Sequence, residues 1–460
     1  MSKNINYTKR ESWGSSFGFI MAAAGSAVGL GNIWKFPYVA GESGGAVFLF
    51  IYLICALLLG FTVMLCEHAL GRNSQQDAVG TFKKIAPGKK WWLVGAIGVL
   101  ASFIILSFYS VVAGWTLAYI FKSVIGSLAG LQLTEYSGFF SNFISNPVEP
   151  IIWQSIFMII TVIIVVAGVQ SGIEKWSKVL MPALFAILLL IIVRSLTLEG
   201  SMEGVKFFLS PDFSKINSTV VLSALGQAFF SLSLGVGAMI TYGSYLNKRS
   251  NIPSAAFMII ALGILVAVLA GLAIFPAVFA TGMSPSGGPG LIFMVLPAVF
   301  SKMPFGHFFE IIFFILLSIA ALTSAISLLE VLVAFIKDQL KWTRKKAAII
   351  SGVLAFIWGI PSSLSQGIWS EFLFKLPGQK PKVFFDLMDF FASNILMPIG
   401  GICVCIFTAY IWKTNNAITE LSNNGKYRYS WLPLWGFLVK YIAPIVIFLV
   451  LLQGLGILKS

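Results

Sequence analysis

The sequence predicts an all-helical integral membrane protein with eleven membrane-spanning helices. Three observations support this fold class. Of 460 residues, 58% are hydrophobic and only 10% are charged, whereas soluble domains carry roughly 25% charged residues. Apolar runs of about 20 residues, the length a helix needs to cross a bilayer, recur along the whole chain. These runs are apolar on nearly every side, as in residues 159–166, so they lack the alternation of β-barrel strands.

The apolar runs place the eleven spans in order along the chain. The first is preceded by Lys9 and Arg10 but continues into Asn32 and Lys35 without a cleavage site, so we expect a span and no cleavable signal peptide. The expected spans are residues 13–36, 44–69, 91–125, 152–169, 176–196, 219–246, 253–281, 308–336, 346–362, 385–412 and 431–457.

The distribution of basic residues predicts the orientation. With the N-terminus inside, 20 of the 31 Lys and Arg residues fall in inside segments, as the positive-inside rule requires. We therefore expect a multi-pass protein of the plasma (inner) membrane with a cytoplasmic N-terminus, and the odd span count places Ser460 outside. The net charge of +14 is spread over separate loops. It suits anionic lipid head groups, and no nucleic-acid partner or obligate protein partner is expected.

Enzyme chemistry is not indicated. The two histidines, His68 and His307, stand alone in different segments, and no Lys-Ser/Thr pair follows the glycines of residues 25–31 to make a phosphate loop. The four cysteines all lie in apolar runs, where packing is their expected role. They are Cys55, Cys66, Cys403 and Cys405.

Two spans carry glycine clusters that predict interrupted helices. Three glycines fall within residues 25–31 of the first span and two within residues 235–237 of the sixth, and each costs about 1 kcal/mol relative to alanine in a helix interior. Unwound backbone at membrane depth is tolerated where it lines a cavity. The alternative is that the glycines are close-packing notches. The polar neighbours favour the cavity: Ser26, Asn32, Ser231 and Ser233.

The interrupted spans are five apart, which predicts two inverted repeats of five helices with an eleventh appended and a binding site at the midplane. Half-helix ends there would attract a carboxylate and a monovalent cation. The expected divisions are a cytoplasmic N-terminal segment at 1–12, repeats at 13–200 and 201–413, and a cytoplasmic loop, helix 11 and an extracellular C-terminus at 414–460.

Three stretches resemble the neurotransmitter:sodium symporter family. They read AGSAVGLGNIWKFP at residues 24–37, GQAFFSLS at 226–233 and AALTS at 320–324, and the similarity runs along nearly the whole chain. The eleven-helix form resembles bacterial members that carry hydrophobic and aromatic amino acids. The resemblance implies sodium-coupled symport of neutral hydrophobic, including aromatic, L-amino acids by alternating access.

The resemblance also implies the substrate pocket. The Tyr109 hydroxyl would bind the carboxylate, and Phe230 would close the pocket from outside. Val236 stands where a leucine-sized pocket has phenylalanine, which leaves room for larger side chains. None of the implied substrate residues is charged, so the cargo's side chain should be neutral. They are Ser26, Ala27, Gly31, Ile105, Tyr109, Phe230, Ser231, Ser233, Val236, Ser324 and Leu328.

Two sodium sites are implied, and one lacks a ligand. Hard oxygen donors suit Na⁺. The first site would use Ala27, Asn32, Ser231 and the substrate carboxylate, which would couple ion to cargo. The family's polar residue of the seventh span falls at Gly263, so weakened sodium affinity is expected there. Whether chloride compensates for the missing residue stays open. The other partners of a chloride site in this family are present, namely Tyr52, Gln227 and Ser231. The second site would use Gly25, Val28, Ala320, Thr323 and Ser324.

Charged residues in or beside spans are implied to be gates, since such charges are costly at membrane depth. Lys35 and Asp389 match an outer pair. Arg10 and Asp338 match an inner pair helped by Trp13, Tyr245 and Glu330. The alternative for each charge is a snorkelling residue near a helix end. In the fifth span, Gly172 and Pro182 match a hinge that lets the inner half unwind.

Two other function classes remain as alternatives. A binding-only sensor of the same fold, deficient in transport, is favoured by the missing ligand at Gly263. An ion channel is disfavoured because the sequence has no filter repeat and the site is single and asymmetric.

Overall fold

The computed structural model describes residues 10–132, 135–282, 285, 291–376 and 379–458. Within them, regular structure is helical apart from one isolated bridge between Phe374 and Lys382. The predicted N-terminal segment lies outside the described residues up to residue 9, and so does Ser460. The described cysteines are all free, in keeping with a packing role.

The described chain contains nine continuous helical stretches long and apolar enough to cross a bilayer. They are α3 (Ala46–Cys55) with η2 (Ala56–Gly60) and α4 (Phe61–Ser74); α6 (Trp92–Val124); α8 (Glu149–Val166); η3 (Val169–Glu174) with α9 (Lys175–Leu196); α13 (Ile252–Ala280); α15 (Gly306–Leu340); α16 (Arg344–Leu364); α17 (Phe384–Asp389) with η7 (Phe390–Leu396), α18 (Met397–Ile406) and η8 (Phe407–Ile411); and α20 (Leu432–Phe437) with η9 (Leu438–Ile442) and α21 (Ala443–Gly454).

The two remaining spans are interrupted, as the glycine clusters predict. The first consists of α1 (Ser16–Ala27), then η1 (Gly31–Lys35) and α2 (Phe36–Glu42), with a bend of 47° at the break. The sixth consists of α11 (Ser218–Ser231) and α12 (Ala238–Ser244), separated by residues 232–237. Together with the nine continuous stretches they make eleven spans, so the predicted fold class is confirmed.

Three boundaries differ from the apolar runs by five residues or more. The second span continues to Ser74, beyond the expected end at residue 69. The first span continues to Glu42, beyond the expected end at residue 36, because Pro37 stands in the first turn of α2, where a helix tolerates proline. The fifth begins at Val169, directly after Gly168, instead of residue 176. The apolar run starts later because it excludes polar residues such as Glu174, which pairs with Lys178 at 2.5 Å. Hydropathy falls at such polar residues although the helix does not end.

Short helices connect the spans and were not predicted, because they are too short to produce an apolar run. They are α5 (Ala78–Ile85), α7 (Glu135–Ser145), α10 (Ser201–Leu209), the 3-10 turn η4 (Phe213–Lys215), η6 (Leu291–Val295) with α14 (Leu296–Ser301), and α19 (Thr414–Leu421).

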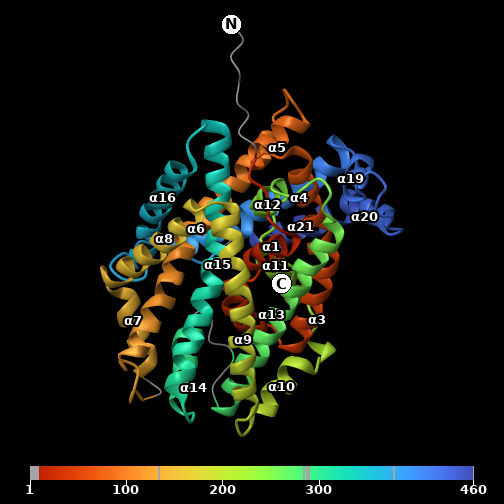
Figure 1. Ribbon diagram of the computed structural model, residues 1–460. Coiled ribbons are helices and arrows are strands. Elements are labelled where there is room, and N and C mark those ends of the chain that lie inside the picture. Colours follow the sequence, from red (N-terminus) through yellow and green to blue (C-terminus); the bar gives the residue numbers. More distant parts are fainter. Residues whose placement is uncertain (1–9, 133–134, 283–284, 286–290, 377–378, 459–460) are drawn as a thin grey trace.

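The interrupted spans lie inside the bundle. Figure 1 shows α5 and α19 at the end where the chain begins and α7, α10 and α14 at the opposite end, with α1 and α11 between them at mid-height. Helix α1 packs against α9, α13 and α15, while α12 packs against α4. Large apolar side chains are instead exposed on outer spans such as α8 and α9, with Ile163 and Val193 each 63% exposed. A bilayer would cover this surface and leave the breaks enclosed.

Candidate functional site

At the break in the first span, α6 and α15 approach the main chain closely. A Cβ atom on Gly29 would lie 2.2 Å from the Ser324 hydroxyl oxygen of α15 and 2.9 Å from the Tyr109 hydroxyl of α6. A methyl group there would displace the Ser324 hydroxyl, so glycine leaves the room that this contact needs. The Leu30 amide, freed by the break, donates to the Tyr109 hydroxyl at 3.1 Å.

The break in the sixth span has left-handed backbone at three positions. Ser233, Gly235 and Gly237 have φ of 52°, 77° and 74°, a region that glycine occupies freely and serine rarely. The Gly235 amide donates to the Glu67 carboxylate at 2.7 Å, and the Val236 carbonyl accepts from Ser102 at 2.7 Å. The freed main-chain groups therefore find partners, as membrane depth requires.

A cavity lies between the two breaks. The cavity is small, about 30 Å³, and all eleven residues predicted to bind substrate line it. Three more lining residues were not in that set: Gly29, Asn32 and Met397. Met397, at the start of α18, carried no sequence signal, because a methionine in an apolar span looks like core. That the cavity binds substrate stays a prediction.

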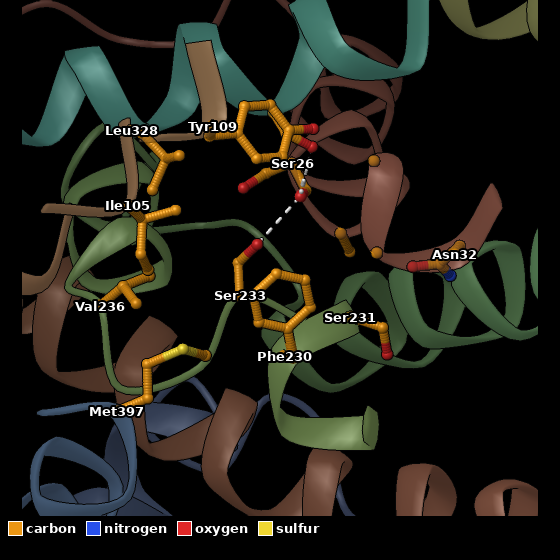
Figure 2. A pocket seen from close by; sticks show the side chains of 14 residues that line it. Ser26, Asn32, Ile105, Tyr109, Phe230, Ser231, Ser233, Val236, Leu328 and Met397 are labelled. Atoms are coloured by element: carbon orange, nitrogen blue, oxygen red, sulfur yellow. Dashed lines mark hydrogen bonds between the residues drawn. The ribbon is translucent and has the colours of Figure 1, made fainter. Parts of the chain in front are cut away.

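The cavity has one polar and one apolar side. Figure 2 shows Ile105, Val236 and Leu328 gathered on one wall, with Met397 below them. On the other side the main-chain carbonyl of Ser26 accepts from the Ser233 hydroxyl at 2.9 Å and lies 3.1 Å from the Ser324 hydroxyl. Such a site suits a small molecule with a polar head and an apolar tail.

One aromatic ring separates this cavity from a wider vestibule. Phe230 lines both spaces. The Lys35 ammonium sits 4.2 Å from the centre of the Phe230 ring and 3.7 Å from the Asp389 carboxylate. The two residues of the predicted outer pair therefore lie together beside Phe230, the residue predicted to close the pocket from outside.

The predicted second sodium set also converges. The Thr323 hydroxyl lies 3.4 Å from the Val28 carbonyl and 3.0 Å from the Ala320 carbonyl, and the Ser324 hydroxyl lies 3.3 Å from the Gly25 carbonyl. These are neutral oxygens from α1, from Val28 directly after it, and from α15. In the described ranges no group of three or more His, Cys, Asp or Glu residues could hold a metal ion, so this oxygen set fits Na⁺ better than a transition metal.

The predicted first sodium set contains an unsatisfied acceptor. Asn32 is fully buried, and its amide nitrogen donates to the Gly263 carbonyl at 2.8 Å while its Oδ1 has no partner among the described residues. Ser231 shares a 3.0 Å hydrogen bond with Tyr52. A buried oxygen without a donor is costly, and a cation at this position would satisfy Asn32.

Replacing Gly263 with aspartate should strengthen sodium binding at this set. A Cβ atom at Gly263 meets only Leu232 Cδ2, at 3.5 Å, so the position has room. We expect the sodium concentration for half-maximal substrate binding to fall by about tenfold, equivalent to about 1.4 kcal/mol. Scintillation-proximity binding across a sodium titration measures it. Gly263→Ala, which fills the space without an oxygen, is the control, and equal sodium dependence in both variants would contradict the idea.

The inner residues form one closed network at the N-terminal end of the bundle. Arg10 pairs with Asp338, its guanidinium lies 4.9 Å from the Tyr245 ring centre, and the Tyr245 hydroxyl donates to Glu330 at 2.6 Å. The Trp13 indole donates to the Tyr242 carbonyl at 3.0 Å. The network thus contains every residue predicted for the inner gate.

Arg344 completes this network but was missed from the sequence. It binds both Glu330, which is fully buried, and Glu11, at 3.0 Å. Glu11 also pairs with Lys337 at 2.6 Å. Arg344 stands among other basic residues in a predicted inside loop, so nothing in the sequence distinguished it from a topology-setting charge.

Acid should loosen this network through Glu11. Burial alone raises the pKa of Glu11, but Arg344 and Lys337 outweigh it and hold the pKa below its ordinary value of 4.5. A carboxylate whose pKa is lower in the folded than in the unfolded protein stabilises the fold. This stabilisation is complete above the pKa of the unfolded state and is lost as the pH falls through the pKa of the folded state. We expect the thermal midpoint to drop below about pH 4.5 and to drop less in Glu11→Gln. Parallel pH curves for the two proteins would exclude this role.

The predicted hinge is wound in this structure. Gly172 lies in the π-helical turn η3 and Pro182 inside α9. A Cβ on Gly172 would lie 2.0 Å from the Ile164 carbonyl oxygen. Glu174 in the same turn accepts from the Gly14 amide at 2.7 Å and ties η3 to the residues before α1. Unwinding of this segment stays a prediction.

Comparisons with known proteins agree over nearly the whole chain. The family model described as the sodium:neurotransmitter symporter family matches residues 10–136 and 142–460. An uncharacterized sodium-dependent transporter of Bacillus subtilis, YhdH, is 47% identical over 97% of this chain and 98% of its own. A second uncharacterized sodium-dependent transporter, from Haemophilus influenzae, is 36% identical over 98% of this chain and 99% of its own.

A solved structure is similar as well. The crystal structure of MhsT in complex with L-phenylalanine is 48% identical in sequence, with a TM-score of 0.89 over 97% of this chain and 100% of that one. The similarity therefore covers both interrupted spans and the cavity between them.

Proposed function

The chain belongs to the sodium:neurotransmitter symporter family and is a sodium-dependent membrane transporter, not an enzyme, and from this premise we propose that its cargo is a neutral hydrophobic L-amino acid, aromatic ones included. The observation that carries the proposal is the cavity between the breaks: it joins a polar end of main-chain groups and hydroxyls to an apolar wall, and none of the described residues that line it is charged.

The polar end suits an amino acid's common head. The Tyr109 hydroxyl, which accepts from the Leu30 amide, keeps its own proton as a donor for a carboxylate. The carbonyls near Ala27, Phe230 and Ser231 are the proposed acceptors for an ammonium. The carboxylate would lie beside the unsatisfied Asn32 Oδ1, where a sodium ion bridges the two. Ion and substrate then raise each other's affinity by the same factor, which is the physical basis proposed for coupling.

The apolar wall suits a large side chain. Ile105, Val236 and Leu328 are neutral, and valine leaves more space than the phenylalanine of a leucine-sized pocket. The similar MhsT was crystallised with L-phenylalanine, which supports an aromatic cargo here.

Alternating access would exchange the two gates. The inner network is closed and Phe230 separates the cavity from the vestibule. In the proposed cycle, cargo and two sodium ions enter past Phe230, the outer pair of Lys35 and Asp389 tightens, and the inner network opens as η3 unwinds. We place the N-terminus on the cytoplasmic side and the C-terminus outside, with repeats dividing near residues 200 and 413. Chloride stays open as a further ion, with Tyr52, Gln227 and Ser231 as its proposed ligands.

Uptake of labelled L-phenylalanine into proteoliposomes tests the proposal. We expect accumulation with an inward sodium gradient, none with choline in its place, and competition by unlabelled L-leucine or L-tryptophan but not by L-lysine or L-glutamate. Thr323→Ala should abolish the sodium response because it removes a ligand oxygen. Accumulation indifferent to sodium would contradict symport, whereas sodium-dependent binding without accumulation would select the sensor alternative that Gly263 favours.

A further inference from the structure

One residue that lines the cavity comes from a span to which no cargo contact is assigned. Of the fourteen described lining residues, thirteen belong to the first, third, sixth and eighth spans, and the remaining one is Met397 of the tenth. Its side chain is buried, with only 2% of its surface exposed. A molecule that fills the cavity would therefore contact Met397.

Close main-chain contacts fix the position of Met397 against the sixth-span break. A Cβ atom on Gly235 would lie 2.3 Å from the Met397 carbonyl oxygen, and a Cβ atom on Gly400 would lie 2.4 Å from the Gly235 carbonyl oxygen. Because the opposing atoms belong to the main chain, rotation of a side chain could not relieve either contact. The beginning of α18 and the break therefore lie directly against one another, with Met397 at their junction.

The Met397 side chain lies on the side of the cavity away from the groups proposed to bind the amino-acid head. Figure 2 shows Tyr109 at the upper side of the cavity and Met397 at the lower side, below Ile105 and Val236. Met397 thus continues the apolar wall. With the cargo's carboxylate at the Tyr109 hydroxyl, the tip of its side chain would point toward this wall and its lower edge.

Met397 is also the side chain at the apolar end that can most easily change its shape. Ile105 and Val236 are β-branched and therefore stiff about χ1, whereas methionine is unbranched, has three rotatable bonds and adapts to irregular spaces. The cavity is small, about 30 Å³, so a large cargo side chain enters only if part of the lining moves. A thioether also interacts favourably with the edge of an aromatic ring, so Met397 can both make room for a ring and bind it.

We propose that Met397 determines which side chains the cavity accepts, because it forms an adjustable floor that yields to an aromatic ring and contacts the ring through its sulfur. This role rests on the proposed function, since it requires an amino acid bound with its head at Tyr109. It gives the tenth span a part in selecting the cargo, in addition to the outer-gate residue Asp389 that the same span carries.

Competition against labelled L-phenylalanine at saturating sodium tests this role in the full-length protein. The measured quantity is the dissociation constant for L-leucine divided by that for L-tryptophan. Met397→Ala removes most of the floor, so we expect this ratio to rise about tenfold, in favour of L-tryptophan. Met397→Leu nearly conserves the volume but removes the sulfur. Its affinity for L-phenylalanine should fall about threefold, while its affinity for L-leucine should stay within about twofold of the parent's.

Met158→Ala is the matched control, because Met158 on α8 is similarly buried, at 3% exposed, and lies outside the cavity. Its ratio should equal that of the parent. The role of Met397 is excluded if both Met397 variants keep the parent's ratio and affinities, or if Met158→Ala shifts the ratio equally. Should Met397→Ala fail to fold, Met397→Leu decides alone. A parent that binds none of these amino acids would instead overturn the proposed function, and the role of Met397 with it.

Discussion

Gly29→Ala is expected to abolish substrate binding. The added methyl would stand 2.2 Å from the Ser324 hydroxyl oxygen and 2.9 Å from the Tyr109 hydroxyl, well inside contact distance. Both side chains are buried and engaged, Tyr109 with the Leu30 amide and Ser324 with the carbonyls of Gly25 and Ser26. Relieving the clash must turn the Ser324 hydroxyl away from these carbonyls and shift the Tyr109 hydroxyl away from the Leu30 amide. We expect a loss of at least about a hundredfold in affinity, or about 2.7 kcal/mol.

Equilibrium binding of labelled L-phenylalanine at saturating sodium measures this loss. Gly138→Ala is the matched control, since a Cβ on Gly138 in α7 meets nothing within 4 Å, and its affinity should equal that of the parent. Parent-like affinity in Gly29→Ala would show that the close approach of the three spans is not needed for binding.

Arg344→Gln is expected to open the inner end of the bundle and to destabilise the closed state. Glu330 is fully buried, and Arg344 neutralises it while also binding Glu11. Removing one partner of a buried ion pair typically costs about 3–5 kcal/mol because the other charge is left uncompensated. The structure can escape part of this cost by admitting water to Glu330, which means separating α15 from the residues before α1.

The opening is measured by the reactivity of a cysteine introduced at Ser244, which in the closed state lies buried 2.7 Å from Arg10. Thiol labelling should accelerate by about tenfold or more in Arg344→Gln, and the thermal midpoint should fall. Lys345→Gln removes the neighbouring charge from an exposed side chain and should do neither. Equal labelling rates in the two variants would exclude Arg344 as part of the gate.

Spans and breaks were predictable because each has a strong one-dimensional signal. A bilayer demands about 20 apolar residues, so most boundaries followed from hydropathy. Glycines cost helix stability, so Gly29 and Gly235 marked the interruptions. The residues gathered around the cavity were identified through a family resemblance, since Ile105 or Leu328 alone would be read as core.

What escaped prediction depends on three-dimensional packing. Met397 enters the cavity because α18 passes beside the sixth-span break: the Met397 carbonyl lies 2.3 Å from where a Gly235 Cβ would be. Arg344 acquires its role from Glu330, which is close in sequence, and from Glu11, more than 300 residues away. No pattern in a single sequence reports such distant neighbours.

The polar end of the cavity has a consequence for how such proteins diversify. The Ser26 carbonyl and the Leu30 amide belong to the main chain, and a point mutation replaces side chains, not main-chain atoms. The opposite wall consists of the exchangeable side chains Ile105, Val236 and Leu328. Mutations at that wall can therefore change the cargo preference while the main-chain groups at the polar end are inherited unchanged. If the cargo is an amino acid, as we propose, descendants of this scaffold should differ in side-chain preference long before they accept molecules of another kind.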